Sequence, residues 1–257
     1  MVYLLAGCPV MLVKKLSAKH SSMVMALQPA EGGFRGGLFD ADGTLIKSER
    51  TYFDTVNMLL APHGIRIGEE EYVDRYMIRH TGSAGIIRDY GLDVSPEEFR
   101  EAKSRILREL IGEGLKAMPH APAVVARLAA EYPLGVVTTE NRHEFDMKRR
   151  GLGFFDSFRF FVTADDVRHK KPHPEPYRLG VEMLSGQVPG IRACEVFAVE
   201  DSPSGAASAR GAGCAVIAYP NGFTADLEFP YADATVGSLE EITPAFLRGL
   251  YAATRTD

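Results

Sequence analysis

The chain lacks tryptophan, has few cysteines and carries no excess of positive charge. Its three cysteines, Cys8, Cys194 and Cys214, include no CxxC pair and are odd in number, which argues against a disulfide framework and against a cysteine zinc site. The formal net charge is -5, so no overall positive field attracts nucleic acid or an anionic membrane, and we expect neither as a partner. Few cysteines, odd in number and without a CxxC pair, suit a reducing compartment, and we expect a cytoplasmic location.

Long hydrophobic runs are also absent. The apolar stretch over residues 2–13 is interrupted by Gly7 and Pro9 and is too short to span a bilayer. Residues 1–30 contain no Asp or Glu, but their lysines follow the apolar stretch, whereas a secretory signal has its positive charge in front. We expect residues 1–35 to be a disordered extension or an over-long start, with targeting to an organelle by residues 1–30 as the alternative.

The most informative stretch that is present covers residues 37–45, where apolar residues lead directly into Asp40 and Asp42. Side chains alternate along an extended segment, so these two carboxylates leave the same side of the chain while Ala41 faces away. Two acids held so close repel each other and call for a cation or a shared proton. Taken alone, Asp42-Gly43 is equally consistent with an acidic hairpin turn, so the interpretation depends on partners elsewhere in the chain.

Helical periodicity without any strand follows this stretch. Apolar residues recur with helical spacing over residues 52–60, 69–80, 83–90 and 95–111. The last of these begins with Ser95, Pro96 and Glu98, the signature of a capping box with proline in the first turn. We therefore predict an inserted helical cap over residues 49–116, which leaves residues 36–48 and 117–257 for the core.

Strands and helices alternate from residue 119 onward. Apolar strands are predicted at residues 134–138, 158–163, 195–200 and 214–219, with helices between them. The helix over residues 142–150 ends in three basic residues, which favour the helix dipole. This alternation predicts an α/β fold with a Rossmann-like parallel sheet core, in which ligands bind at the carboxyl ends of the strands.

Acidic, hydroxyl and basic side chains gather at those predicted strand ends: Asp40, Asp42, Thr138, Lys171, Glu200 and Asp201. Each has an ordinary explanation when taken alone, such as a strand-end hydroxyl, a solvated lysine or an acid that starts a helix. Four acids at one edge repel one another unless a divalent cation such as Mg²⁺ takes oxygen ligands from them. A hydroxyl and an ammonium are donors that a phosphoryl group needs. Because these residues follow consecutive predicted strands, we expect them to form one common site.

These segments resemble the four motifs of the haloacid dehalogenase superfamily, in its helical-cap (C1) phosphatase and β-phosphoglucomutase-like group. The motifs match at residues 39–45, 136–138, 171–174 and 199–205. The resemblance implies that Asp40 is the nucleophile that forms an aspartyl-phosphate, and that Asp42 is the general acid and base. It also implies a Mg²⁺ site made by Asp40, the backbone carbonyl of Asp42, Asp201 and Glu200. Thr138 and Lys171 would bind the phosphoryl oxygens, with backbone donors near Ala41 and Thr139.

The function implied is a Mg²⁺-dependent phosphomonoesterase acting on a small sugar or polyol phosphate, in a monomer or small homo-oligomer. Two alternatives stay open: a sugar phosphomutase resembling β-phosphoglucomutase, and a non-catalytic binding module on the same core. Thr44 favours the phosphatase, because those mutases tend to have valine there. The chain departs from the family pattern at Lys47, Lys170 and residues 119–121, all near the substrate entrance.

The cap residues expected to approach the substrate are Tyr52, Arg79, His80, Thr81 and Ser83, although His80 is equally consistent with an exposed histidine at a helix end. We expect His143, His169 and His173 to be surface or loop residues, with no two placed to share a metal ion.

Overall fold

The computed structural model describes residues 32–79, 81–112 and 114–254. The expectation for residues 1–31 therefore lies outside the described residues. Phe34 is buried and packs edge-on against Phe197 and Tyr251. The amide of Arg35 donates to the carbonyl of Glu195 at 2.7 Å. We had placed these two residues in the extension, but they pack against the core.

Within the described residues, six strands form one parallel sheet in the order β3-β2-β1-β4-β5-β6. The strands are β1 (Gly36–Phe39), β2 (Leu134–Val137), β3 (Phe160–Val162), β4 (Val196–Glu200), β5 (Ala215–Ala218) and β6 (Ala234–Thr235). The predicted α/β fold with a Rossmann-like parallel sheet is confirmed. Because β1 lies between β2 and β4, the residues that follow these three strands meet at one edge of the sheet.

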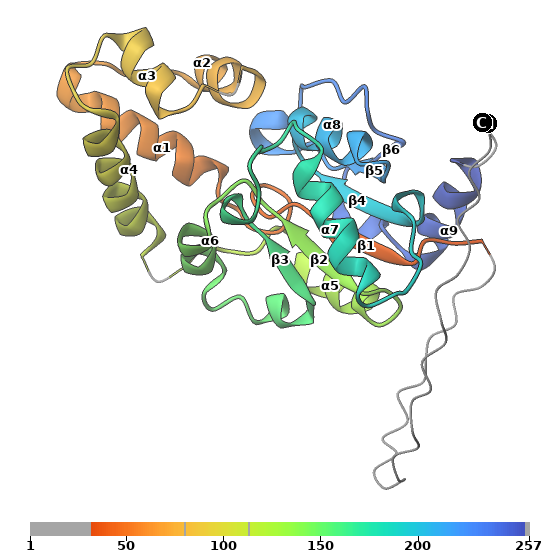
Figure 1. Cartoon of the computed structure of the whole chain (residues 1–257). Helices are drawn as coiled ribbons and strands as arrows, with labels where there is room; N and C mark the ends of the chain where they lie inside the picture. The colour runs from red at the N-terminus through yellow and green to blue at the C-terminus, as the bar shows by residue number, and fades with distance from the viewer. Residues whose placement is uncertain (1–31, 80, 113, 255–257) are drawn as a thin grey trace, which may run out of the picture.

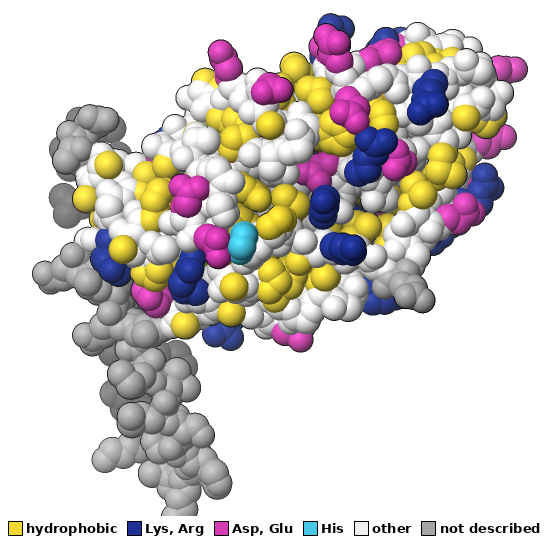
Figure 2. All heavy atoms as spheres, turned by 180° about the vertical axis from the view of Figure 1, so that it is seen from behind, with side chains coloured by type: hydrophobic (Ala, Val, Ile, Leu, Met, Phe, Trp, Pro, Cys, Tyr) yellow, Lys and Arg dark blue, Asp and Glu magenta, His cyan; other side chains and the backbone are white. Residues whose placement is uncertain are grey.

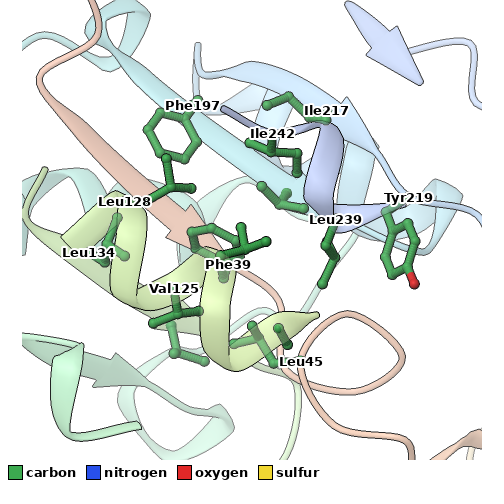
Figure 3. Packing of buried hydrophobic residues seen from close by; sticks show 14 of the residues in the cluster. Phe39, Leu45, Val125, Leu128, Leu134, Phe197, Ile217, Tyr219, Leu239 and Ile242 are labelled. Atoms are coloured by element: carbon green, nitrogen blue, oxygen red, sulfur yellow. The ribbon is translucent and has the colours of Figure 1, made fainter. Parts of the chain in front are cut away.

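Helices cover both faces of this sheet (Figure 1). On one face, α7 (Glu175–Ser185) and α8 (Pro203–Gly211) pack over an apolar cluster with Leu38. On the other, α5 (Ala121–Ala129) and α9 (Pro244–Ala253) enclose the larger cluster around Phe39 and Leu45 (Figure 3). Each fully buried phenylalanine or leucine stabilises the fold by about 1.5–3 kcal/mol, so this core holds the start of the 40–45 loop firmly.

The helices α1 (Glu49–Leu60), α2 (Glu69–Tyr72), α3 (Ser83–Tyr90) and α4 (Pro96–Ile111) stand together at one end of the molecule (Figure 1). A π-helical turn over Val73–Ile78 continues α2. These helices enclose an apolar cluster of their own, which includes Phe53, Leu60 and Phe99. The capping box predicted at Ser95 is present, with Ser95 and Glu98 each accepting the other's backbone amide.

Two adjacent chain segments join this helical part to the sheet. The amide of Lys47 donates to the carbonyl of Lys116, and the amide of Met118 donates to the carbonyl of Leu45, each at 2.9 Å. The outgoing and returning chains are thus bonded together at the base of α1 and after α4.

Charged side chains of both signs are interspersed on the face that Figure 2 presents. No helix among the described residues is both long and apolar enough to cross a membrane.

Candidate active site

The loop after β1 leaves the sheet through a tight turn at Gly43. The amide of Asp40 still donates to the carbonyl of Val199, at 3.0 Å, and the amide of Gly43 donates to the carbonyl of Ile46, at 2.9 Å. Gly43 has φ +77°, and a Cβ there would lie 2.0 Å from Oδ2 of Asp201. Only glycine suits this turn, because any other residue would be strained at this positive φ and its Cβ would clash with the carboxylate of Asp201.

Asp40 and Glu200 are bridged by the ammonium of Lys171. Lys171 lies in the loop between β3 and α7, and its Nζ donates to Oδ1 of Asp40 at 2.5 Å, to Oε1 of Glu200 at 2.6 Å and to the carbonyl of Val137 at 2.8 Å. The hydroxyl of Tyr177, on α7, donates to the same oxygen of Glu200 at 2.6 Å. All four side chains are almost fully removed from water, so these contacts are strong and fix the acids in place.

Three of the predicted metal-binding acids converge beside Lys171. Oxygens of Asp40, Glu200 and Asp201 all lie within 4.8 Å of one another. Burial raises the pKa of Asp40 to about 7, against the opposing charge of Lys171, and burial also raises the pKa of Asp201. Glu49, at the start of α1, adds a carboxylate whose buried Oε1 accepts no hydrogen bond from the described residues. One ammonium does not balance these acids, and their oxygens fit a hard divalent cation.

The side chain of Asp42 is held by a different set of partners. Lys148 donates to both carboxylate oxygens, each at 2.6 Å, and the hydroxyl of Ser48 donates to Oδ1 at 2.5 Å. Lys148 lies on α6 (Arg142–Arg149) and is fully buried, and its ammonium also donates to the hydroxyl of Tyr52 on α1 at 2.9 Å. Burial alone would lower the pKa of Lys148, but the charges of Asp42 and Glu140 outweigh it and raise that pKa.

The sequence did not identify Lys148 as a site residue, because a lysine near the end of a helix has an ordinary explanation in the dipole. The two carboxylates of the 40–44 turn therefore share one site, but each is bound by its own buried lysine.

The predicted phosphate-binding residues separate into two groups. Lys171 and Thr139 line the cavity above the strand ends. Thr138 is buried and its hydroxyl accepts the amide of Glu140 at 3.2 Å, and Thr138 is not among the described residues that line the cavity.

The cavity between the sheet edge and the helical part has a volume of about 190 Å³. The core contributes carboxylates, Lys171 and hydroxyls, and the helical part contributes Tyr52, Tyr72, Tyr76 and Met77. Ligand pockets commonly measure about 300–1,000 Å³, so this cavity suits a ligand of only a few carbon atoms beside a phosphate.

Of the cap residues that the sequence suggested, Tyr52 lines this cavity. Arg79 instead pairs with Asp74 on the surface, at 3.0 Å. Thr81 and Ser83 are not among the described residues that line the cavity, and His80 lies outside the described residues. Tyr72, Tyr76 and Glu49 carried no distinguishing signal, because only the packing of the helical part on the core turns them inward.

Two histidines lie together outside this cavity, contrary to our expectation. His169 and His173 have ring centroids 4.5 Å apart, and potential ligand atoms of both lie within 4.8 Å of one another and of Glu175. The Glu175 carboxylate already accepts the amides of Arg168 and His169 and contacts Nδ1 of His169 at 2.8 Å. These contacts satisfy the acid without a metal ion.

Comparison with known proteins identifies the family of this chain and its phosphatase relatives. The family model of haloacid dehalogenase-like hydrolases matches residues 38–219. A phosphoglycolate phosphatase of Yersinia pseudotuberculosis is 28% identical over 222 residues, which cover 82% of this chain and 92% of that protein. Hexitol phosphatase A of Escherichia coli is 30% identical over 215 residues, which cover 81% and 93%.

The fold is also similar to that of a solved structure. A crystal structure of a CbbY mutant of Rhodobacter sphaeroides in complex with xylulose-(1,5)bisphosphate has a TM-score of 0.71 and 27% identity, and the match covers 83% of this chain and 99% of that one. The family match and the phosphatase relatives confirm the predicted enzyme class, a phosphatase hydrolase. The family model matches from the end of β1 to the residue after β5, and the chain belongs to the haloacid dehalogenase-like hydrolase family.

Proposed function

We propose that this protein is a Mg²⁺-dependent phosphomonoesterase that hydrolyses a small sugar or polyol phosphate through an aspartyl-phosphate on Asp40. The observation that carries the proposal is the pair of carboxylates in one turn that both line the cavity. Asp40 is bound to Lys171 and lies beside Glu200 and Asp201. Asp42 is bound to Lys148 and lies where it can exchange a proton with a ligand in the cavity.

The chain's own residues divide the reaction into two displacements. Lys171 binds one oxygen of Asp40 and so orients the other for attack on phosphorus, which releases the alcohol. Asp42 donates a proton to the leaving oxygen and then accepts one from the water that cleaves the aspartyl-phosphate. Lys171 and the residues after β2 stabilise the transferring phosphoryl oxygens. Mg²⁺ held by Asp40, the carbonyl of Asp42 and Asp201, with Glu200 beside them, would neutralise the charge of the phosphoryl group.

The cavity lining favours an uncharged leaving group. The relatives include enzymes named for phosphoglycolate, whose leaving group carries a carboxylate, and for hexitol phosphate, whose leaving group carries only hydroxyls. Among the described lining residues, Lys171 is the one Lys or Arg, and its ammonium already binds Asp40 and Glu200. Besides Lys171, carboxylates and Met77, the lining consists of tyrosine, serine and threonine residues, whose hydroxyls are suitable partners for a polyol.

The same reasoning disfavours the mutase alternative. A phosphomutase has to hold a bisphosphate, so it needs cations for a second phosphate group, and Lys171 is again the one Lys or Arg among the described lining residues.

A panel of phosphate esters tests the proposal. Phosphate release would be measured with excess Mg²⁺ and with EDTA, for glycerol and hexitol phosphates, phosphoglycolate, and glucose 1-phosphate with a bisphosphate primer. We expect Mg²⁺-dependent release, fastest from a polyol or sugar phosphate. Interconversion of hexose phosphates without net release would instead establish the mutase, and no turnover of any ester would favour the binding module.

A further inference from the structure

We propose that Lys148 is a positioning residue that holds the carboxylate of Asp42 in its working orientation and ties it, through Tyr52, to the first helix of the cap. The proposal rests on the proposed function, because it concerns the acid and base step of that reaction. It assigns a role to a residue of α6 that lies outside the family motifs.

The first observation is the complete burial of a cation. Lys148 has no exposed surface, and lysine is seldom fully buried without paired partners. Its partners are both oxygens of Asp42 at 2.6 Å and the hydroxyl of Tyr52 at 2.9 Å. Glu140 is also near, but its Oε2 is 3.9 Å from the ammonium, beyond hydrogen-bond distance. Asp42 is therefore the main ionic partner.

The second observation is that these contacts occupy Asp42 on both oxygens. Together with Ser48, whose hydroxyl lies 2.5 Å from Oδ1, Lys148 leaves the carboxylate one orientation in which all its contacts are kept. Asp42 nevertheless lines the cavity and keeps 24% of its side chain exposed. It is fixed yet accessible, which is what a group that exchanges protons with a substrate requires.

Stability alone does not account for this arrangement. Desolvating an ion pair offsets most of its attraction, so a buried apolar side chain of similar size would serve packing at least as well. The ammonium also joins three separate elements, namely the turn after β1, α6 in the core and α1 in the cap. Movement of α1 would therefore disturb the orientation of Asp42, which couples the acid and base step to the position of the cap.

Substrates with different leaving groups distinguish a positioning role of Lys148 from a purely structural one. An alcohol leaves only when it is protonated, whereas dinitrophenolate leaves without a proton. In Lys148→Met we expect kcat for the best sugar or polyol phosphate to fall by about 100-fold, the lower end of what general acid and base catalysis supplies. The pre-steady-state burst of dinitrophenolate from 2,4-dinitrophenyl phosphate should slow by less than about 3-fold, followed by slow turnover, because Asp42 is also the base for the second step.

Two further variants complete the test. Arg149→Met, one residue along the same helix, removes a cation that pairs with Asp146, and it should leave both rates unchanged. If Lys148 acts through Asp42, then adding Lys148→Met to Asp42→Asn should slow turnover by less than about 3-fold beyond Asp42→Asn alone. This comparison can be made even if Lys148→Met alone fails to fold. In the double variant position 42 carries no charge, so no carboxylate is left there without its counter-ion.

The outcomes that overturn the proposal are distinct from failure of the proposed function. A wild-type protein that hydrolyses no ester would refute both the proposed function and the role of Lys148. An active wild type with a fully active Lys148→Met would refute the role of Lys148 alone, as would equal slowing of the burst and of sugar phosphate turnover. A further tenfold loss when Lys148→Met is added to Asp42→Asn would show that Lys148 acts independently of Asp42.

Discussion

Replacing Lys171 by methionine should destabilise the protein substantially, because it leaves buried acids without their counter-ion. The ammonium makes three hydrogen bonds, to Asp40, Glu200 and the carbonyl of Val137, and only 3% of the side chain is exposed. Removing one partner of a buried ion pair costs about 3–5 kcal/mol. That is a large part of the 5–15 kcal/mol, in order of magnitude, that stabilises a typical domain.

The penalty should depend on pH in a definite direction. Burial, opposed by Lys171, raises the pKa of Asp40 to about 7, above its unfolded value, so folding favours the protonated acid. Stability from a raised pKa is present at low pH and is lost as the pH rises through the folded pKa. Without Lys171 the pKa of Asp40 would rise further. Lys171→Met should therefore be less destabilised at pH 5 than at pH 8.

Urea denaturation of the metal-free protein, followed by circular dichroism at both pH values, measures this effect. The matched control is Lys170→Met, the neighbouring and exposed lysine, which should change the free energy of unfolding by less than about 0.5 kcal/mol. A loss below about 1 kcal/mol for Lys171→Met at pH 8, or a larger loss at pH 5 than at pH 8, would refute the electrostatic argument.

Three further outcomes follow from the same site. Gly43→Ala places a Cβ 2.0 Å from Asp201 at positive φ, so Mg²⁺ binding measured by calorimetry should weaken at least tenfold, and unchanged affinity would contradict the tight turn. Tyr177→Phe removes a hydrogen bond to the buried Glu200 and should cost about 1.5–3 kcal/mol in urea denaturation, a value that a change below 0.5 would contradict. Burial and neighbouring Glu140 raise the pKa of Glu144 to about 7, so wild-type stability should decline between pH 4.5 and 7 more steeply than that of Glu144→Gln, and parallel curves would disprove this.

The sheet and the strand-end acids could be predicted because both follow from short-range pattern. Buried parallel strands are continuous apolar runs; β1 and β2 are each followed at once by a polar residue, and β4 ends in one. Parallel strands place their carboxyl ends at one edge, so Asp40 and Glu200 meet there, and the loop between β3 and α7 brings Lys171 to both of them. The two-residue strand β6 carries too little pattern to be predicted.

The residues that sequence reasoning missed are those whose role depends on how segments distant in the sequence pack together. Helical spacing puts Lys148 on the same face as the buried Phe145 but does not indicate its partner, and Glu49 at the start of α1 is an ordinary first-turn acid. Tyr72 and Tyr76 line the cavity, but in the sequence they too had an ordinary explanation, because aromatic side chains at helical spacing usually fill a core. The packing of the helical part on the sheet edge brings Glu49, Tyr72 and Tyr76 to the site, and the packing of α6 beside the 40–44 turn brings Lys148 there.

Trapping of the covalent intermediate tests the central claim most directly. During turnover of a ³²P-labelled sugar or polyol phosphate with Mg²⁺, acid quenching of the wild type should leave hydroxylamine-sensitive label on the peptide that contains Asp40. Asp40→Asn should remain folded, release no phosphate and retain no label. Label on another residue, or steady phosphate release by Asp40→Asn, would contradict the account.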